Sequence, residues 1–136
     1  MTDARTGAPA GATTQAALPP GITRSRAELQ RLRDDALAAD PRDPVMVPIA
    51  WCSPQGLASV LEGITDTTRW LLGEKERAPI SLEPATYPQL PIRGVRTHAE
   101  DVIHTSKWPD VSEWYGGGVK RTLEWAMGGD ERPMDA

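Results

Sequence analysis

The chain has 136 residues, of which 39% are hydrophobic and 25% are charged, values typical of one globular domain. A net charge of −4 argues against a nucleic-acid-binding protein, because such proteins normally carry a basic stripe. The single cysteine, Cys52, excludes an intrachain disulfide, and no apolar run approaches the roughly 20 residues that span a bilayer.

The first segment, residues 1–22, consists mainly of Ala, Gly, Thr and Pro, and we expect a flexible arm there. A helix is predicted to begin at Ser25, because Ser25 and Glu28 have the spacing of a capping box, and to end before Pro41. Three prolines then predict an extended, partly buried crossing over residues 41–51.

The second predicted helix has the strongest signals. Ser53 is suited to cap it, Pro54 fits its first position, and Gly73 fits the left-handed residue after its end. Its apolar residues recur at helical spacing, and they are Leu57, Val60, Leu61, Ile64, Leu71 and Leu72, with Thr68 among them.

Residues 74–96 contain four prolines together with apolar residues, so we expect an extended segment laid across the helices. A third helix is predicted to begin at Thr97, where Glu100 completes a capping-box spacing, and to end before Pro109.

The fourth predicted helix begins at Asp110, with Glu113 again at capping-box spacing, and runs to Met127, where Gly128 closes it. Residues 116–118 are three glycines inside this helix. Since Gly costs up to about 1 kcal/mol relative to Ala, we expect a weakened or kinked helix there.

The chain contains an internal repeat, because residues 54–77 recur as residues 109–132 at a constant shift of about 55 positions. The identical pairs are Pro54 and Pro109, Gly63 and Gly118, Thr67 and Thr122, Trp70 and Trp125, Gly73 and Gly128, Glu76 and Glu131, and Arg77 and Arg132. In each helix the Gly, Thr and Trp form a stripe beside the apolar face. Small residues let another backbone approach closely, so the two helices are predicted to pack as pseudo-equivalent partners.

The pattern G-[IV]-x-x-T-x-x-W-x-x-G in both copies resembles that of small actinobacterial and actinophage proteins in which a helix ends in Trp-x-x-Gly. The resemblance covers only the two copies and implies no activity, cofactor or catalytic residue. A charged tail follows each copy, and Arg77 or Arg132 is predicted to bond the last carbonyls of its own helix.

Few residues carry recognisable chemistry. Cys52 precedes a helix N-terminus, a setting that lowers the pKa of a thiol, and His98 or His104 would be its base. The two histidines lie about 120° apart around their helix, which is poor for shared metal ligation. Lys120 follows the glycine run without the P-loop spacing. We therefore predict no catalytic residue, no metal and no cofactor. A small enzyme or metal-binding protein that uses Cys52 with His98 and His104 is the alternative.

A second alternative is a small DNA-associated regulator. It would use the densest basic run, which is formed by Arg24, Arg26, Arg31 and Arg33. Four aspartates follow within ten residues, so a solvated helix face of mixed charge is the preferred interpretation.

These observations predict a mostly α-helical protein in which residues 23–136 form a small four-helix domain of two related halves, joined by a proline-rich extended crossing. We expect a non-enzymatic protein–protein interaction or assembly protein, such as an adaptor, an accessory subunit or a phage-type structural component. Its partner would be another protein or a second copy, with neither nucleic acid nor membrane expected. A cytoplasmic location, or incorporation into a virion or larger assembly, follows from the lack of a signal-peptide pattern. The partner-binding candidates are Trp70, Trp125, Trp114, Tyr115, Arg77 and Arg132.

Overall fold

The computed structural model describes residues 18–42, 51–75, 78–80, 92–104 and 112–134. This part of the chain contains four α-helices and a short 3₁₀ turn, and no strand. The elements are α2 (Arg26–Ala38), η1 (Pro54–Gly56), α3 (Leu57–Leu71), α4 (Ile92–His104) and α5 (Glu113–Ala126). The predicted small, mostly α-helical domain of four helices is therefore confirmed. Most of the two predicted extended crossings, and residues 1–17 of the predicted arm, lie outside the described residues.

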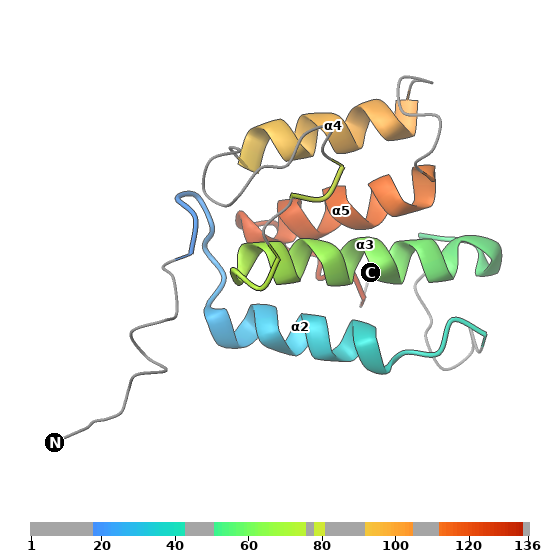
Figure 1. The fold of residues 1–136 in the computed structure, drawn as a ribbon, viewed down its shortest axis with the longest axis horizontal. Helices are drawn as coiled ribbons and strands as arrows, with labels where there is room; N and C mark the ends of the chain where they lie inside the picture. Colours follow the sequence, from blue (N-terminus) through green and yellow to red (C-terminus); the bar gives the residue numbers. More distant parts are fainter. Residues whose placement is uncertain (1–17, 43–50, 76–77, 81–91, 105–111, 135–136) are drawn as a thin grey trace, which may run out of the picture.

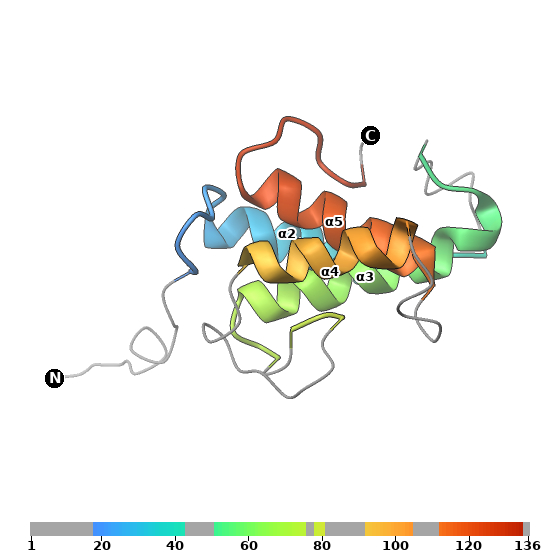
Figure 2. The same cartoon turned by 90° about the horizontal axis from the view of Figure 1, so that it is seen from above.

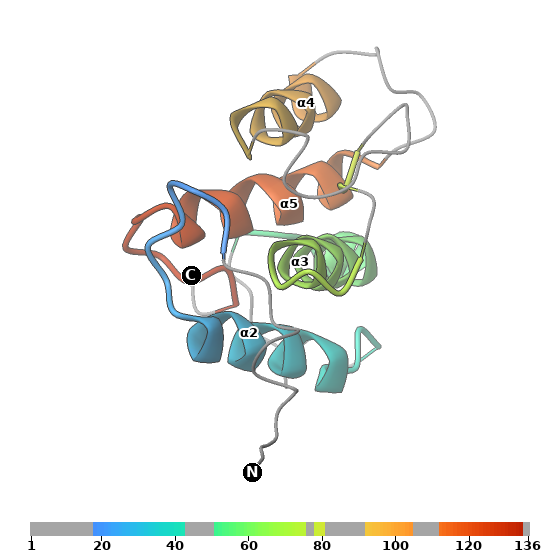
Figure 3. The same ribbon diagram turned by 60° about the vertical axis from the view of Figure 1, so that its left-hand side comes forward.

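The four helices lie side by side in the order α2, α3, α5, α4 (Figures 1 and 3). The contact between α3 and α5 is central, while α2 packs against α3 and α4 packs against α5. The segment after α5 turns back along the bundle (Figure 2). The two helices that carry the sequence repeat thus form the middle of the domain.

Two glycines from the two copies meet where α3 crosses α5. A Cβ atom on Gly63 would come within 2.5 Å of the Tyr115 carbonyl oxygen, and one on Gly118 within 2.5 Å of the Val60 carbonyl oxygen. Since no larger residue fits between these backbones, the crossing depends on Gly at both positions. The two repeat helices therefore pack against each other, as predicted, with their glycines at the contact.

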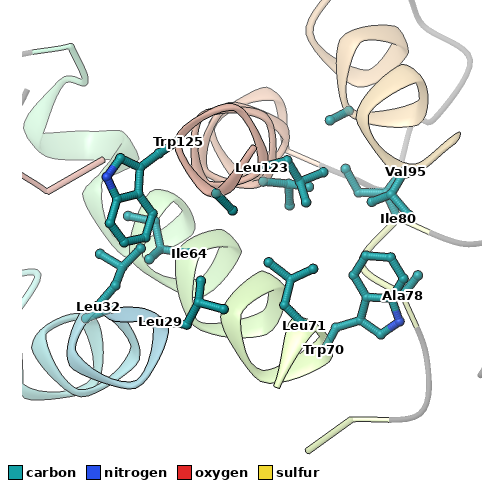
Figure 4. Close-up of a cluster of buried hydrophobic side chains, with 14 of the residues drawn as sticks. Leu29, Leu32, Ile64, Trp70, Leu71, Ala78, Ile80, Val95, Leu123 and Trp125 are labelled. Carbon is teal, nitrogen blue, oxygen red and sulfur yellow. The ribbon is translucent and has the colours of Figure 1, made fainter. Parts of the chain in front are cut away.

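The threonines and tryptophans of both copies are buried beside this crossing. The hydroxyls of Thr67 and Thr122 each donate a hydrogen bond of 2.7 Å to the carbonyl of the glycine four residues earlier. Both hydroxyls are therefore satisfied inside the core. The indole of Trp70 lies toward Ala78, whereas that of Trp125 lies near Leu32 of α2 (Figure 4). The two indoles thus fill opposite sides of the same core.

Several helix ends match the sequence signals. Both bonds of the predicted capping box join Ser25 and Glu28, at 3.1 Å and 2.9 Å. Ser53 accepts a bond from the Gly56 amide, so it caps the 3₁₀ turn, and the α-helix itself begins only after that turn. Gly73 and Gly128 have φ values of 81° and 120°, the left-handed conformation predicted after each helix.

Two predicted helix starts are wrong. Helix α4 begins at Ile92 rather than at Thr97, because an apolar face that begins at Ile92 and continues through Val95 packs against α5. The tertiary contact therefore overrides the capping signal of Thr97 and Glu100. Helix α5 begins at Glu113 rather than at Asp110, because Ser112 supplies the N-cap and accepts a bond from the Trp114 amide.

The three consecutive glycines lie within an unbroken α5, so the expected kink is absent, while the expected weakening stays a prediction. Each faces a different neighbour. A Cβ on Gly116 would lie 2.8 Å from Val102 of α4, and one on Gly117 would lie 3.3 Å from the ring of Trp51. Gly118 faces α3, as described above. Close packing on three sides offsets the low helix propensity of Gly.

The Gly118→Ala variant is expected to lower the free energy of unfolding by about 1–3 kcal/mol, because its methyl group would collide with the Val60 carbonyl. Gly117→Ala is the matched control. Its methyl group would meet only the edge of a side chain, and Ala favours a helix by up to about 1 kcal/mol. Urea denaturation measures both variants, and equal losses of stability would contradict the role assigned to the crossing.

Candidate functional site

The two repeated tryptophans, both predicted to bind a partner, are buried in this structure. Trp70 is 0% exposed and Trp125 is 4% exposed. In the folded chain described here they present no surface to another molecule, and they stabilise the core by the large area that each indole buries.

Two arginines at or just before the start of α2 bond the ends of the central helices. Arg24 donates to the carbonyl of Trp125 at 3.0 Å and stacks over its ring, and Arg26 donates to the carbonyl of Leu72 at 3.2 Å. Arg132 pairs with Asp35 of α2. Arg77 lies outside the described residues.

These contacts also change the interpretation of the basic run. Arg24 and Arg26 are engaged with helix ends, and Arg33 pairs with Asp34 and Glu74. Arg31 is the exposed member of the run. Most of the cationic groups that would form a DNA-binding stripe therefore hold this chain together.

The alternative in which Cys52 is a reactive thiol is not supported by its environment. Burial raises the pKa of the Cys52 thiol, which is opposite to the expected effect of a helix N-terminus. The ring of His98 is hydrogen-bonded through Nδ1 to the Ile80 carbonyl at 3.0 Å, while His104 is exposed at the end of α4. Within the described ranges, no group of three or more His, Cys, Asp or Glu residues is placed to hold a metal ion.

A hollow of about 340 Å³ lies between the end of α4, the first half of α5 and the segment before η1. We call it the tryptophan hollow. Its lining residues are Trp51, Ile103, His104, Glu113, Trp114, Gly117, Lys120 and Arg121. The sequence identified Trp114 as a candidate, but it gave no reason to place Trp51 beside it, because Trp51 lies outside the repeat.

Both indoles of the tryptophan hollow are held against backbone. The Nε1–H of Trp51 donates to the carbonyl of Pro133 at 3.0 Å, and its ring packs against Gly117. The Trp114 ring lies on Gly56, where a Cβ would come within 2.4 Å of the ring. Each indole remains partly exposed, so the two rings form a preorganised apolar surface at the edge of the domain.

Two cations of α5 complete the hollow. The guanidinium of Arg121 lies over the Trp51 ring, 4.4 Å from its centroid. Its ion-pair partner in the described part of the chain is Glu131, with a separation of 3.8 Å, and Lys120 lies 3.5 Å from Glu124. These distances and the exposure of the partners mean that both ion pairs are weak.

Tyr115 faces away from the tryptophan hollow and joins the two central helices. Its hydroxyl donates to the Asp66 carboxylate at 2.8 Å. Burial, and then the bond to Asp66, raises the pKa of Tyr115 far above its usual value of about 10. This partner-binding candidate therefore has a structural contact of its own, between α5 and α3.

Comparisons of the chain with protein-family models, with curated proteins and with solved structures find no significant match. Among the described helices, none has both the length and the apolar character that crossing a membrane would require.

The contribution of Tyr115 to stability is expected to be fully present below about pH 10 and to be lost as the pH rises further. Above that pH, the unfolded tyrosine ionises while the folded one keeps its proton, so the unfolded state binds fewer protons and becomes favoured. Urea denaturation at increasing pH measures this loss. In Tyr115→Phe the dependence on alkaline pH should be shallower, and an unchanged dependence would contradict the assignment.

Proposed function

We propose that this chain is a non-enzymatic interaction protein, an adaptor or accessory subunit, that holds a partner protein or a second copy at the tryptophan hollow. The observation that carries the proposal is the pair of fixed, partly exposed indoles, Trp51 and Trp114, beside the stacked guanidinium of Arg121. Tryptophan and arginine are the residues most enriched among those that dominate binding energy at protein interfaces.

The size of the hollow supports a side chain as its occupant. Sites for small molecules commonly occupy about 300–1,000 Å³, so 340 Å³ lies at the lower end of that range. Such a volume fits one or two side chains inserted from a partner and is small for a nucleotide cofactor. The lining combines two indoles and Ile103 with charged side chains, and protein interfaces likewise combine aromatic and charged residues.

The alternatives draw less support from the contacts. An enzyme that used Cys52 would need an activated thiol near a base, whereas burial raises the pKa of this thiol and His98 bonds a backbone carbonyl. A DNA-associated regulator would need an accessible basic stripe, whereas Arg24 and Arg33 make contacts within the domain.

The test is capture of partners from the source cells on the tagged full-length chain, compared among three forms. Wild type is expected to retain a stoichiometric protein at high salt, and Trp114→Ala is expected to lose most of it, because truncating an interface anchor typically costs about 2 kcal/mol or more. Leu37→Ala is the matched control, since Leu37 is an apolar residue of α2 that is 51% exposed and lies outside the hollow.

Thermal unfolding of each variant separates loss of binding from loss of fold. Recovery of the bare chain from wild type, or equal retention of the partner by Trp114→Ala and wild type, would contradict the proposed function.

A further inference from the structure

We propose that the tryptophan hollow recognises a peptide segment in which a carboxylate side chain adjoins an aromatic one. The inference rests on the proposed function and names the chemistry of the partner. The aromatic side chain would contact Trp51 and Trp114, while the carboxylate would bind Arg121, with Lys120 beside it.

The charge around the hollow favours an anionic partner. Lys120 and Arg121 line it from consecutive positions of α5, and Glu113 is the acidic residue of the lining. His104, at the end of α4, adds a further hydrogen-bonding group to the lining. Among the described residues that line the hollow, two side chains are positive and one is negative, so this part of the lining is positive, although the whole chain has a net charge of −4.

The present ion pairs of these cations can be replaced at little cost. The carboxylate of Glu131 is 77% exposed and lies 3.8 Å from Arg121, beyond hydrogen-bond distance. By contrast, Arg24 and Arg26 elsewhere in the domain donate direct hydrogen bonds to backbone carbonyls. An incoming carboxylate that meets the guanidinium edge-on would gain the paired hydrogen bonds that Glu131 does not make.

The orientation of Arg121 is already set before any ligand binds. The contact with the Trp51 ring restrains the guanidinium, and Trp51 is itself fixed by its bond to Pro133. A planar cation fixed in this way loses little side-chain entropy when a carboxylate binds along its edge. The same indole that orients the cation also lines the apolar space, so the two halves of the ligand would be recognised next to each other.

The arrangement favours one carboxylate over a chain of phosphates. A second hollow, of about 140 Å³, lies on the other side of Arg121, and its lining includes Glu124, Asp130 and Glu131. A nucleic-acid strand that extended beyond the two cations would meet these carboxylates, and phosphate binding requires a continuous positive path. A single acidic side chain avoids this repulsion.

The experiment is a titration of the full-length, isotopically labelled chain with acetyl-Asp-Phe-amide, followed through the indole N–H signals in NMR spectra. Acetyl-Asn-Phe-amide is the nearly isosteric neutral control, and acetyl-Lys-Phe-amide reverses the charge. Because only the protein is isotopically labelled and the chain contains no Phe, isotope-filtered spectra separate the phenyl signals of the peptide from the aromatic signals of the protein.

We expect the Asp peptide to shift the Trp51 and Trp114 indole signals and to bind about tenfold more tightly than the Asn peptide, with the Lys peptide weaker still. Arg121→Gln should remove this preference. Arg42→Gln is the matched control, because it removes the same charge from a side chain that is 89% exposed and outside the hollow. Arg121→Lys, which keeps the charge without the planar fork, should retain part of the preference.

Equal affinity for the Asp and Asn peptides would overturn the inference and leave the proposed function intact, since the hollow would still bind an apolar side chain. Absence of indole shifts with all three peptides would also overturn it, and the proposed function would then be decided by the capture experiment with Trp114→Ala. Tighter binding of a single-stranded thymidine oligonucleotide than of the Asp peptide at the same indoles would overturn both.

Discussion

The close approach of α3 and α5 at Gly63 and Gly118 is the contact on which the rest of the domain depends. Each glycine faces a backbone carbonyl of the other helix at a distance that excludes a methyl group. Beside this contact, the hydroxyls of Thr67 and Thr122 donate to carbonyls of their own helices, so neither of them is buried without a hydrogen bond. The two central helices together offer two outer faces: α2 packs against α3, and α4 packs against α5.

Helix α5 links this core to the candidate site through three adjacent glycines. Gly118 faces α3, Gly116 faces α4, and Gly117 faces the ring of Trp51. Consecutive residues of a helix are turned by about 100° around its axis. Three successive glycines therefore leave room for neighbouring groups on three sides of α5. The low helix propensity of these glycines is therefore offset by the close packing that they permit. The tryptophan hollow and the α3–α5 crossing lie at the same turn of α5.

The cationic side chains described below fall into two groups: those that bond helix ends inside the domain, and those that line the tryptophan hollow. Arg24 and Arg26 bond the carbonyls at the ends of α5 and α3, which favour positive charge, and they tie the start of α2 to both central helices. Lys120 and Arg121 lie instead at a partly exposed hollow with distant ion-pair partners. In an acidic chain this makes the hollow a local positive site, which is the reason for assigning it an anionic, aromatic ligand.

The sequence by itself determined the features that depend on residues close together along the chain. The helical class, the capping box at Ser25, the left-handed Gly73 and the glycine stripe could all be recognised from short-range spacing. Only the tertiary structure decided where α4 begins, that Trp125 is buried, and that Trp51 forms a hollow. Trp51 is fixed by Pro133, a residue 82 positions away, and no local pattern reports such a contact. Caps and periodicity arise within a few residues, whereas a binding surface forms only when distant segments pack together.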